Sequence, residues 1–163
     1  MACGPHSIHA PGVRRSPSRP LRSARRWCMR FLVAWDGSDG AQAALRQARA
    51  LAGSDGQIDL VQVLNPLIDA AEIEAPSRRE AMAIVSERAR TGMAAHAAGA
   101  GQHVIVLEHG EEVTDRFLQE AARLNAEIVV IASRRAAGLR GVLGSITQQV
   151  LHDAKLPVLV VPA

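Results

Sequence analysis

The stretch RFLVAWDGSDGAQAAL, residues 30–45, passes from a strand-like pattern to a helix-like one. Its first part is a continuous apolar run, as expected of a strand that is buried on both faces. Asp36, Gly37 and Ser38 interrupt this run, and Ser38 can cap the helix that follows. The stretch therefore predicts a β-loop-α unit that begins a parallel sheet.

The same alternation recurs along the rest of the chain. Five apolar runs predict strands, at residues 30–35, 58–64, 103–108, 127–132 and 157–161. Four stripes at helical spacing lie between them: Ala44, Ala48, Leu51 and Ala52; Met82, Val85, Ala89 and Met93; Val113, Phe117, Ala121 and Leu124; Ile146, Val150 and Ala154. Right-handed crossovers then predict an α/β fold, a doubly wound parallel sheet with helices on both faces.

The positive charge of the chain lies at its beginning. Residues 1–28 contain six arginines, four prolines and no acidic residue, which predicts a disordered basic tail. An abrupt change of pattern at Met29 favours a second interpretation, that this segment lies upstream of the natural start. Residues 29–163 are predicted to form one domain, in which 13 basic residues face 16 acidic ones.

Composition excludes several classes of function for residues 29–163. The aromatic content of the chain is 2%, which leaves few stacking platforms for nucleic-acid bases. No apolar run is long enough for a membrane span, and both cysteines precede Met29. The histidines at 96, 103, 109 and 152 lack metal-ligand spacing and are interpreted as surface or strand-end residues. We expect a cytoplasmic protein with no metal site, no membrane contact and no nucleic-acid partner.

Ligands of doubly wound sheets bind beyond the carboxyl ends of the strands, where the winding direction reverses. Two loops occupy such places. Asp36 follows the first strand and can meet a ribose hydroxyl, although the DGSD stretch also fits a purely structural helix cap. Gly144, Ser145 and Thr147 begin the last helix, where backbone amides can hold phosphate or Ser145 can merely cap the helix.

Four segments resemble the universal stress protein family: FLVAWDGSDGAQAAL, VQVLNP, EHGEEVTDRFLQEAARLNAEIVVIASR and GLRGVLGSITQQVLHDAKLPVLVV. The resemblance covers residues 29–163 and implies strand order 3-2-1-4-5, an adenine nucleotide α-hydrolase-like fold. It implies that Asp36 lies near the ribose, that the backbone around Val63 meets the adenine, and that Gly144, Ser145 and Thr147 hold phosphates. It also implies a homodimer through the C-terminal strand, 157–161.

The ATP-binding members of that family carry G-x2-G-x9-G-[ST] after the fourth strand. Ala132 and Arg135 stand in place of the first two glycines, and eight residues separate Arg135 from Gly144. Guanidinium groups of Arg134, Arg135 and Arg140 can replace the lost amide donors, or these arginines are solvated surface charges. The predicted adenine-nucleotide site comprises Asp36, Gly37, Ser38, Val63, Ala132, Arg134, Arg135, Gly144, Ser145, Ile146 and Thr147.

The function predicted from these features is a small regulatory binding module, not an enzyme. It acts through dimerisation and through ATP or another adenine nucleotide held in a partly degenerate loop. Two alternatives stay open: a nucleotide-free dimeric interaction protein, and a weak ATP hydrolase of the same fold.

Overall fold

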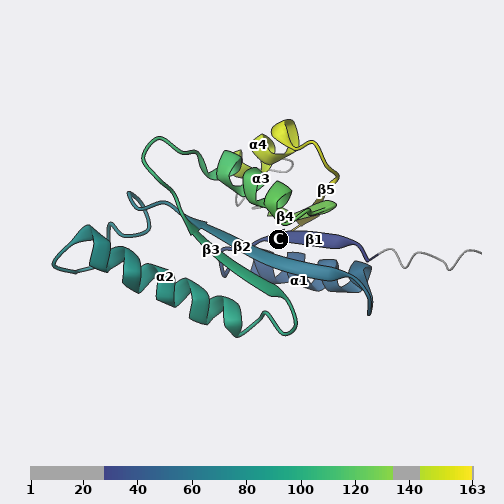
Figure 1. Ribbon diagram of the computed structural model, residues 1–163, viewed down its shortest axis with the longest axis horizontal. Coiled ribbons are helices and arrows are strands. Elements are labelled where there is room, and N and C mark those ends of the chain that lie inside the picture. Colours follow the sequence, from purple (N-terminus) through teal and green to yellow (C-terminus); the bar gives the residue numbers. More distant parts are fainter. Residues whose placement is uncertain (1–27, 134–143, 163) are drawn as a thin grey trace, which may run out of the picture.

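The computed structural model describes residues 28–133 and 144–162, so the predictions for the basic tail and for Arg134, Arg135 and Arg140 fall outside the described residues. Five parallel strands form one sheet in the order β3-β2-β1-β4-β5 (Figure 1). Their bounds are Arg30–Ala34 (β1), Gln57–Leu64 (β2), Gly101–Val106 (β3), Ile128–Ser133 (β4) and Val158–Pro162 (β5). The predicted fold class and strand order are confirmed.

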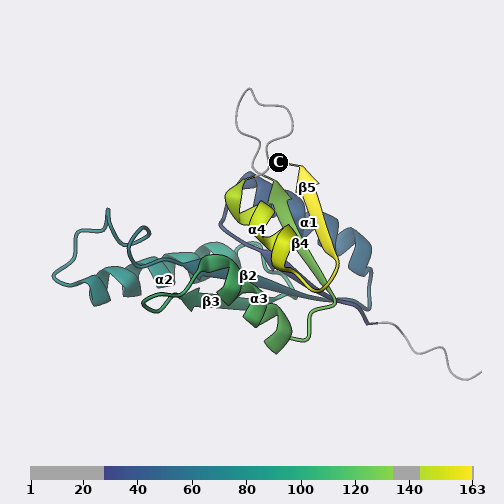
Figure 2. The same ribbon diagram turned by 90° about the horizontal axis from the view of Figure 1, so that it is seen from above.

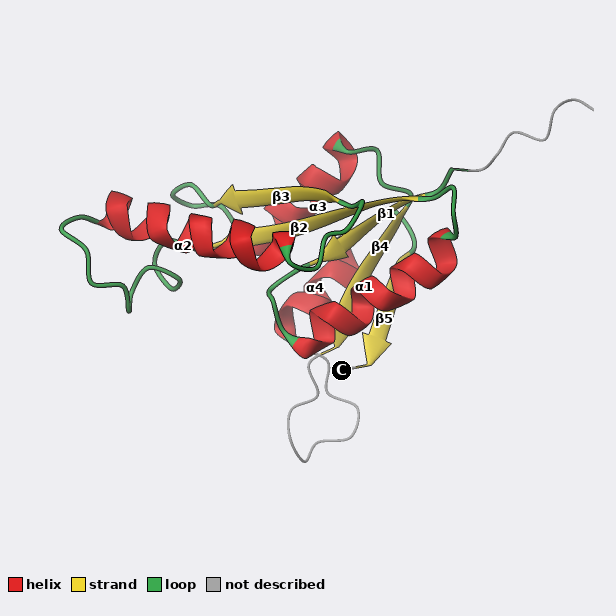
Figure 3. Cartoon of the chain, turned by 90° about the horizontal axis from the view of Figure 1, so that it is seen from below, coloured by secondary structure: helices red, strands yellow, loops and turns green. Residues whose placement is uncertain are grey.

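Four helices connect the strands: α1 (Asp39–Ala52), α2 (Arg78–Ala94), α3 (Val113–Arg123) and α4 (Ser145–Asp153). Helices α1 and α2 cover one face of the sheet, which Figure 3 shows from their side, and α3 and α4 cover the other. In the described part of the chain, no helix combines the length and the apolar character that a membrane crossing requires.

Successive side chains along β1 and the residue after it point to opposite faces of the sheet and contribute to the core on both faces. Phe31, Val33 and Trp35 pack with α1 and the end of α2, whereas Leu32 packs with α3 and α4. All four side chains are at most 4% exposed, as expected of a central strand with helices on both sides.

The order of the strands places the switch in winding direction between β1 and β4. Val33 pairs with Leu60 on one side and with Val130 on the other. Chain connections leave β1 toward β2 and enter β4 from α3, so the carboxyl ends of β1 and β4 lie side by side at one edge of the sheet. This edge is where a ligand of a doubly wound sheet is expected. Figure 2 shows β4 beside β5 and α4 from above.

Two residues of the predicted helical stripes do not belong to the core. Leu51 and Ile146 are 53% and 47% exposed, whereas Ala48 and Val150 on the same helices are fully buried. Leu51 lies in the last turn of α1, and Ile146 in the first turn of α4, where each helix extends past the sheet-facing stripe. Periodicity alone does not show where this coverage ends.

Candidate nucleotide site at the carboxyl edge of the sheet

The loop after β1 is organised by its own polar side chains. Asp36 Oδ1 accepts hydrogen bonds from the backbone N–H of Ser38 at 3.0 Å and from the Ser38 hydroxyl. The Ser38 Oγ in turn accepts from Ala41 N at 3.2 Å and caps α1. Gly37 has φ +77°, a conformation that favours glycine. Asp36 itself is exposed at the mouth of the sheet, so the loop has a structural cap and an outward carboxylate together.

Val63 directs its backbone toward the gap that opens beyond β1. Trp35 N donates to Val61 O on the β1 side of β2, and Leu107 N donates to Leu64 O on the β3 side. Since successive residues of a parallel strand turn their backbone groups to opposite neighbours, Val63 faces the β1 side. Among the described residues, no bond from β1 follows the one to Val61. The Val63 N–H and C=O thus lie beyond the last residue of the β1 side that pairs with β2.

The start of α4 is joined directly to the end of β4. The Thr147 hydroxyl donates to the Ala132 carbonyl at 3.2 Å, and Thr147 is 4% exposed. This bond fixes the first turn of α4 at the carboxyl edge of the sheet. Thr147 has its hydroxyl on the protein backbone, whereas Ser145 beside it is exposed.

The two helix N-termini at this edge differ in their electrostatics. Helix α1 begins with the Ser38 cap and carries Asp39 in its first turn, which complements the positive end of the helix. Gly144, with extended φ and ψ, immediately precedes α4, which has no acidic residue in its first turn. Among the described residues no side chain caps this helix, so its first amides can bind an anion.

The structure thus brings the predicted residues of the described ranges to one edge of the sheet. Asp36 and Ser133 each lie three residues beyond the paired Val33 and Val130. The Thr147 bond to Ala132 holds the start of α4 at the same level. In the described residues, no group of histidine, cysteine, aspartate and glutamate side chains is arranged to hold a metal ion.

A second polar cluster, not anticipated from the sequence, lies near the amino ends of β2 and β3 on the α3 face. His103 Nε2 is 3.0 Å from Asp59 Oδ1, and His103 Nδ1 is 3.6 Å from Glu120 Oε1. Arg123 donates to both carboxylate oxygens of Glu120, with 2.8 Å between Nε and Oε2. The sequence interpreted His103 as a surface or strand-end residue and not as a metal ligand; it lies in β3, and its ring also contacts two carboxylates.

Gly101 makes this cluster geometrically feasible. Asp59 pairs with Gly101 across the sheet, and a Cβ at Gly101 would lie 2.0 Å from Asp59 Oδ1. The carboxylate occupies the space of the missing side chain and reaches His103, two residues further along β3. The hydrogen bond from Arg123 lowers the pKa of Glu120 from its usual value, against the opposing effect of burial.

A sequence model described as the universal stress protein family matches residues 29–162. No curated protein matches the chain.

Several solved structures have a similar fold. Hypothetical protein MJ0577 is 21% identical, with a TM-score of 0.66 over 83% of this chain and 96% of its own. A universal stress protein family member from Burkholderia pseudomallei is 24% identical, with a TM-score of 0.54 over 85% and 98%. A universal stress protein solved in complex with cAMP is 21% identical, with a TM-score of 0.52 over 82% and 96%.

Proposed function

Because the chain belongs to the universal stress protein family, we propose that it is a regulatory module that binds an adenine nucleotide at the carboxyl edge of its sheet. The observation that carries this proposal is the convergence there of the Asp36 carboxylate, the outward-facing Val63 backbone and the uncapped start of α4. These groups suit a ribose, an adenine and a phosphate respectively. The cAMP complex of a protein with the same fold supports the ligand class.

The expected mechanism is a population shift without turnover of the nucleotide. The nucleotide would join the loop after β1 to the start of α4 and so stabilise one arrangement of the edge between them. A protein partner would then distinguish the nucleotide-bound from the nucleotide-free form. The size of this effect is limited by the difference in nucleotide affinity between the two arrangements.

Thermal unfolding of the full chain with and without ATP tests this proposal. Ligand at ten times its Kd adds about 1.4 kcal/mol to the stability of the folded state, which raises Tm by roughly 3–6 °C. The variant S145E adds a carboxylate at the start of α4, which stabilises a free helix N-terminus but repels phosphate. We expect S145E to fold and to lose the ATP-dependent rise in Tm. The variant Q148E adds the same charge on an exposed face one turn later and should keep the rise.

A nucleotide-free interaction protein is the second candidate, because part of the polar set is already used by the protein itself. The Thr147 hydroxyl donates a hydrogen bond to Ala132 O, and the Ser38 hydroxyl donates one to Asp36 Oδ1. Millimolar ATP without any effect on Tm of the wild-type chain would favour this candidate.

We further propose that the chain forms a homodimer through β5. This strand is at one end of the sheet order and, among the described strands, pairs with β4 alone. Its residues Val158–Val161 are half-buried valines and leucine. An apolar edge strand of this kind needs a cover, and a second copy can provide it. Light scattering should show a dimer at micromolar concentration, and a monomer independent of concentration would contradict this proposal.

A further inference from the structure

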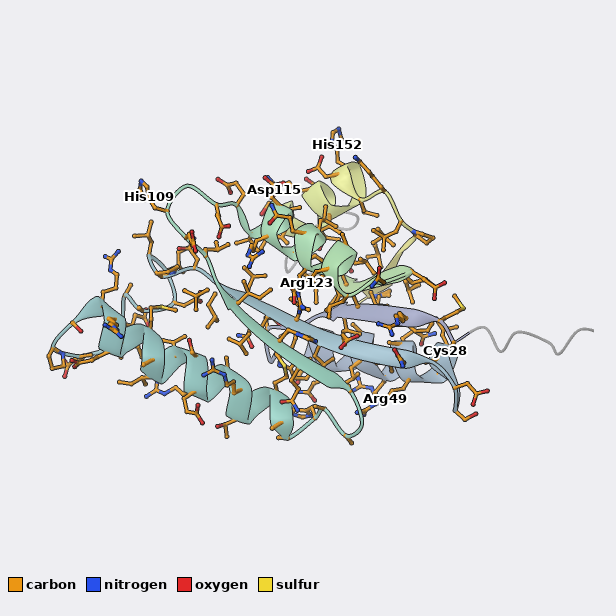
Figure 4. All side chains as sticks on the ribbon, in the orientation of Figure 1. Cys28, Arg49, His109, Asp115, Arg123 and His152 are labelled. Atoms are coloured by element: carbon orange, nitrogen blue, oxygen red, sulfur yellow. The ribbon has the colours of Figure 1, made fainter. Side chains whose placement is uncertain are left out.

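A groove of about 210 Å³ lies on the face of the sheet that α1 and α2 cover, between α1 and the turn that follows α2. Gln42, Arg46 and Arg49 line it from α1, and His96 and Ala98 line it from the turn. Neither the Asp36 carboxylate nor the start of α4 belongs to it. Figure 4 shows Arg49 on the α1 side of the sheet and Arg123, of the second polar cluster, on the opposite side.

The walls of the groove carry positive charge without a neutralising partner. Two guanidinium groups and one imidazole line it, and its lining contains no carboxylate. Within residues 28–133 and 144–162, neither Arg46 nor Arg49 forms an ion pair with an acidic side chain. The charged lining therefore favours an anion.

Arg49 is held in position across the groove. Its Nη2 donates to the carbonyl oxygens of His96 at 2.7 Å and of Ala98 at 3.3 Å. Both bonds use the same nitrogen, so Nε–H and Nη1 have no hydrogen-bond acceptor among the described residues. A guanidinium that is already oriented loses little side-chain entropy when it binds an oxyanion.

Trp35 connects this groove to the core beneath it. Its ring lies 5.3 Å from the ring of His96, with a 45° angle between the planes. Trp35 is 4% exposed, and its Nε1 has no hydrogen-bond partner in the part of the chain that the structure describes. A buried donor without an acceptor is costly, so a small shift of His96 that brings an acceptor to Nε1 would be favourable. The indole is also placed to report any change in the position of His96.

We propose that this groove binds a small oxyanion, a carboxylate or phosphate compound, between Arg46, Arg49 and His96. The volume corresponds to roughly seven water molecules, which suits a metabolite-sized anion and not a whole nucleotide. Ala95 and Ala98, which are both exposed, supply an apolar surface for the carbon skeleton of such a compound. The site is separate from the proposed nucleotide site and does not depend on it.

The test uses the full chain with Trp27→Phe, so that Trp35 is the only tryptophan. Citrate and glucose 6-phosphate are titrated at constant ionic strength, with emission and calorimetric heat followed in parallel. We expect saturable binding of at least one anion in the millimolar range, and the anion that binds identifies carboxylate or phosphate as the preferred group.

Two variants decide whether the groove is the site. R46Q should weaken the binding about fivefold, as expected for loss of one partly solvated ionic contact. R88Q removes the same charge from an exposed position on α2 and should leave the affinity unchanged. Absence of heat and of an emission change with both anions would overturn the proposal, as would equal affinities of R46Q and the parent chain.

Discussion

Replacing Arg123 by glutamine is expected to destabilise the protein more than replacing Glu120 by glutamine, although both changes remove the same ion pair. The Glu120 side chain is 5% exposed and the Arg123 side chain 59%. Loss of the carboxylate leaves a guanidinium that water already solvates. Loss of the guanidinium leaves a buried carboxylate whose nearest remaining side-chain partner is the His103 ring, with Nδ1 at 3.6 Å.

The expected cost of E120Q follows from the bonds it removes. A hydrogen bond to a charged group contributes about 1.5–3 kcal/mol, and the solvated partner places this pair near the lower end, about 1.5 kcal/mol. The loss of stability in R123Q should be larger than about 1.5 kcal/mol. The double variant E120Q/R123Q should lie closer to E120Q, because it no longer contains a buried charge.

The dependence on pH gives a second measure of the same asymmetry. Arg123 lowers the pKa of Glu120 in the folded protein, so this carboxyl contributes stability that is present above its unfolded pKa, about 4.3. That contribution is lost as the pH falls through the lower folded pKa. R123Q lacks the hydrogen bond that lowers the pKa of Glu120, while burial still disfavours the charged carboxylate. Protonation of Glu120 at low pH therefore removes the cost of a buried, unpaired charge in this variant. The difference in free energy of unfolding between R123Q and E120Q should therefore be smaller at pH 4 than at pH 7.

Urea denaturation followed by circular dichroism at pH 7 and pH 4 provides these free energies of unfolding. If R123Q proves no less stable than E120Q at pH 7, or the difference between them is the same at both pH values, the assigned burial of Glu120 is refuted.

Three further substitutions test particular contacts by the same denaturation assay. G101A should cost about 1 kcal/mol, because its Cβ would displace the Asp59 carboxylate from His103. G92A, which meets open space on α2, should instead stabilise by about 0.5–1 kcal/mol, and a similar loss in both would contradict this reasoning. T147V removes the bond to the β4 end and should cost about 1 kcal/mol, and an unchanged stability would show that this bond does not hold α4.

The fold could be predicted because local pattern and long-range arrangement agree. Apolar runs identified all five strands, and only their ends shifted: β3 was predicted at 103–108 and spans Gly101–Val106. Gly101 and Gln102 lie outside the apolar run, but they pair with β2 and so extend β3 at its start. Pairing of this kind depends on the neighbouring strand and is not visible in a single run.

The sequence predicted that Asp36 and the start of α4 share one edge of the sheet, but it did not specify the hydrogen bonds that these residues make. The DGSD stretch left a cap and a ligand contact both open, and the hydrogen bonds show that Ser38 is the cap. The cluster around His103 was missed because Asp59 and Glu120 come from distant segments. One available signal was Asp59, an acidic residue inside the strand predicted at 58–64.

Backbone amide chemical shifts of the full chain during titration with ATP test whether a nucleotide binds at the carboxyl edge of the sheet. We expect saturable shifts at Ser38, Val63, Ser145 and Ile146, whose amides lie at that edge. This expectation would be contradicted by the absence of shifts at millimolar ATP. Shifts confined to the groove between α1 and residues 95–98 would contradict it equally.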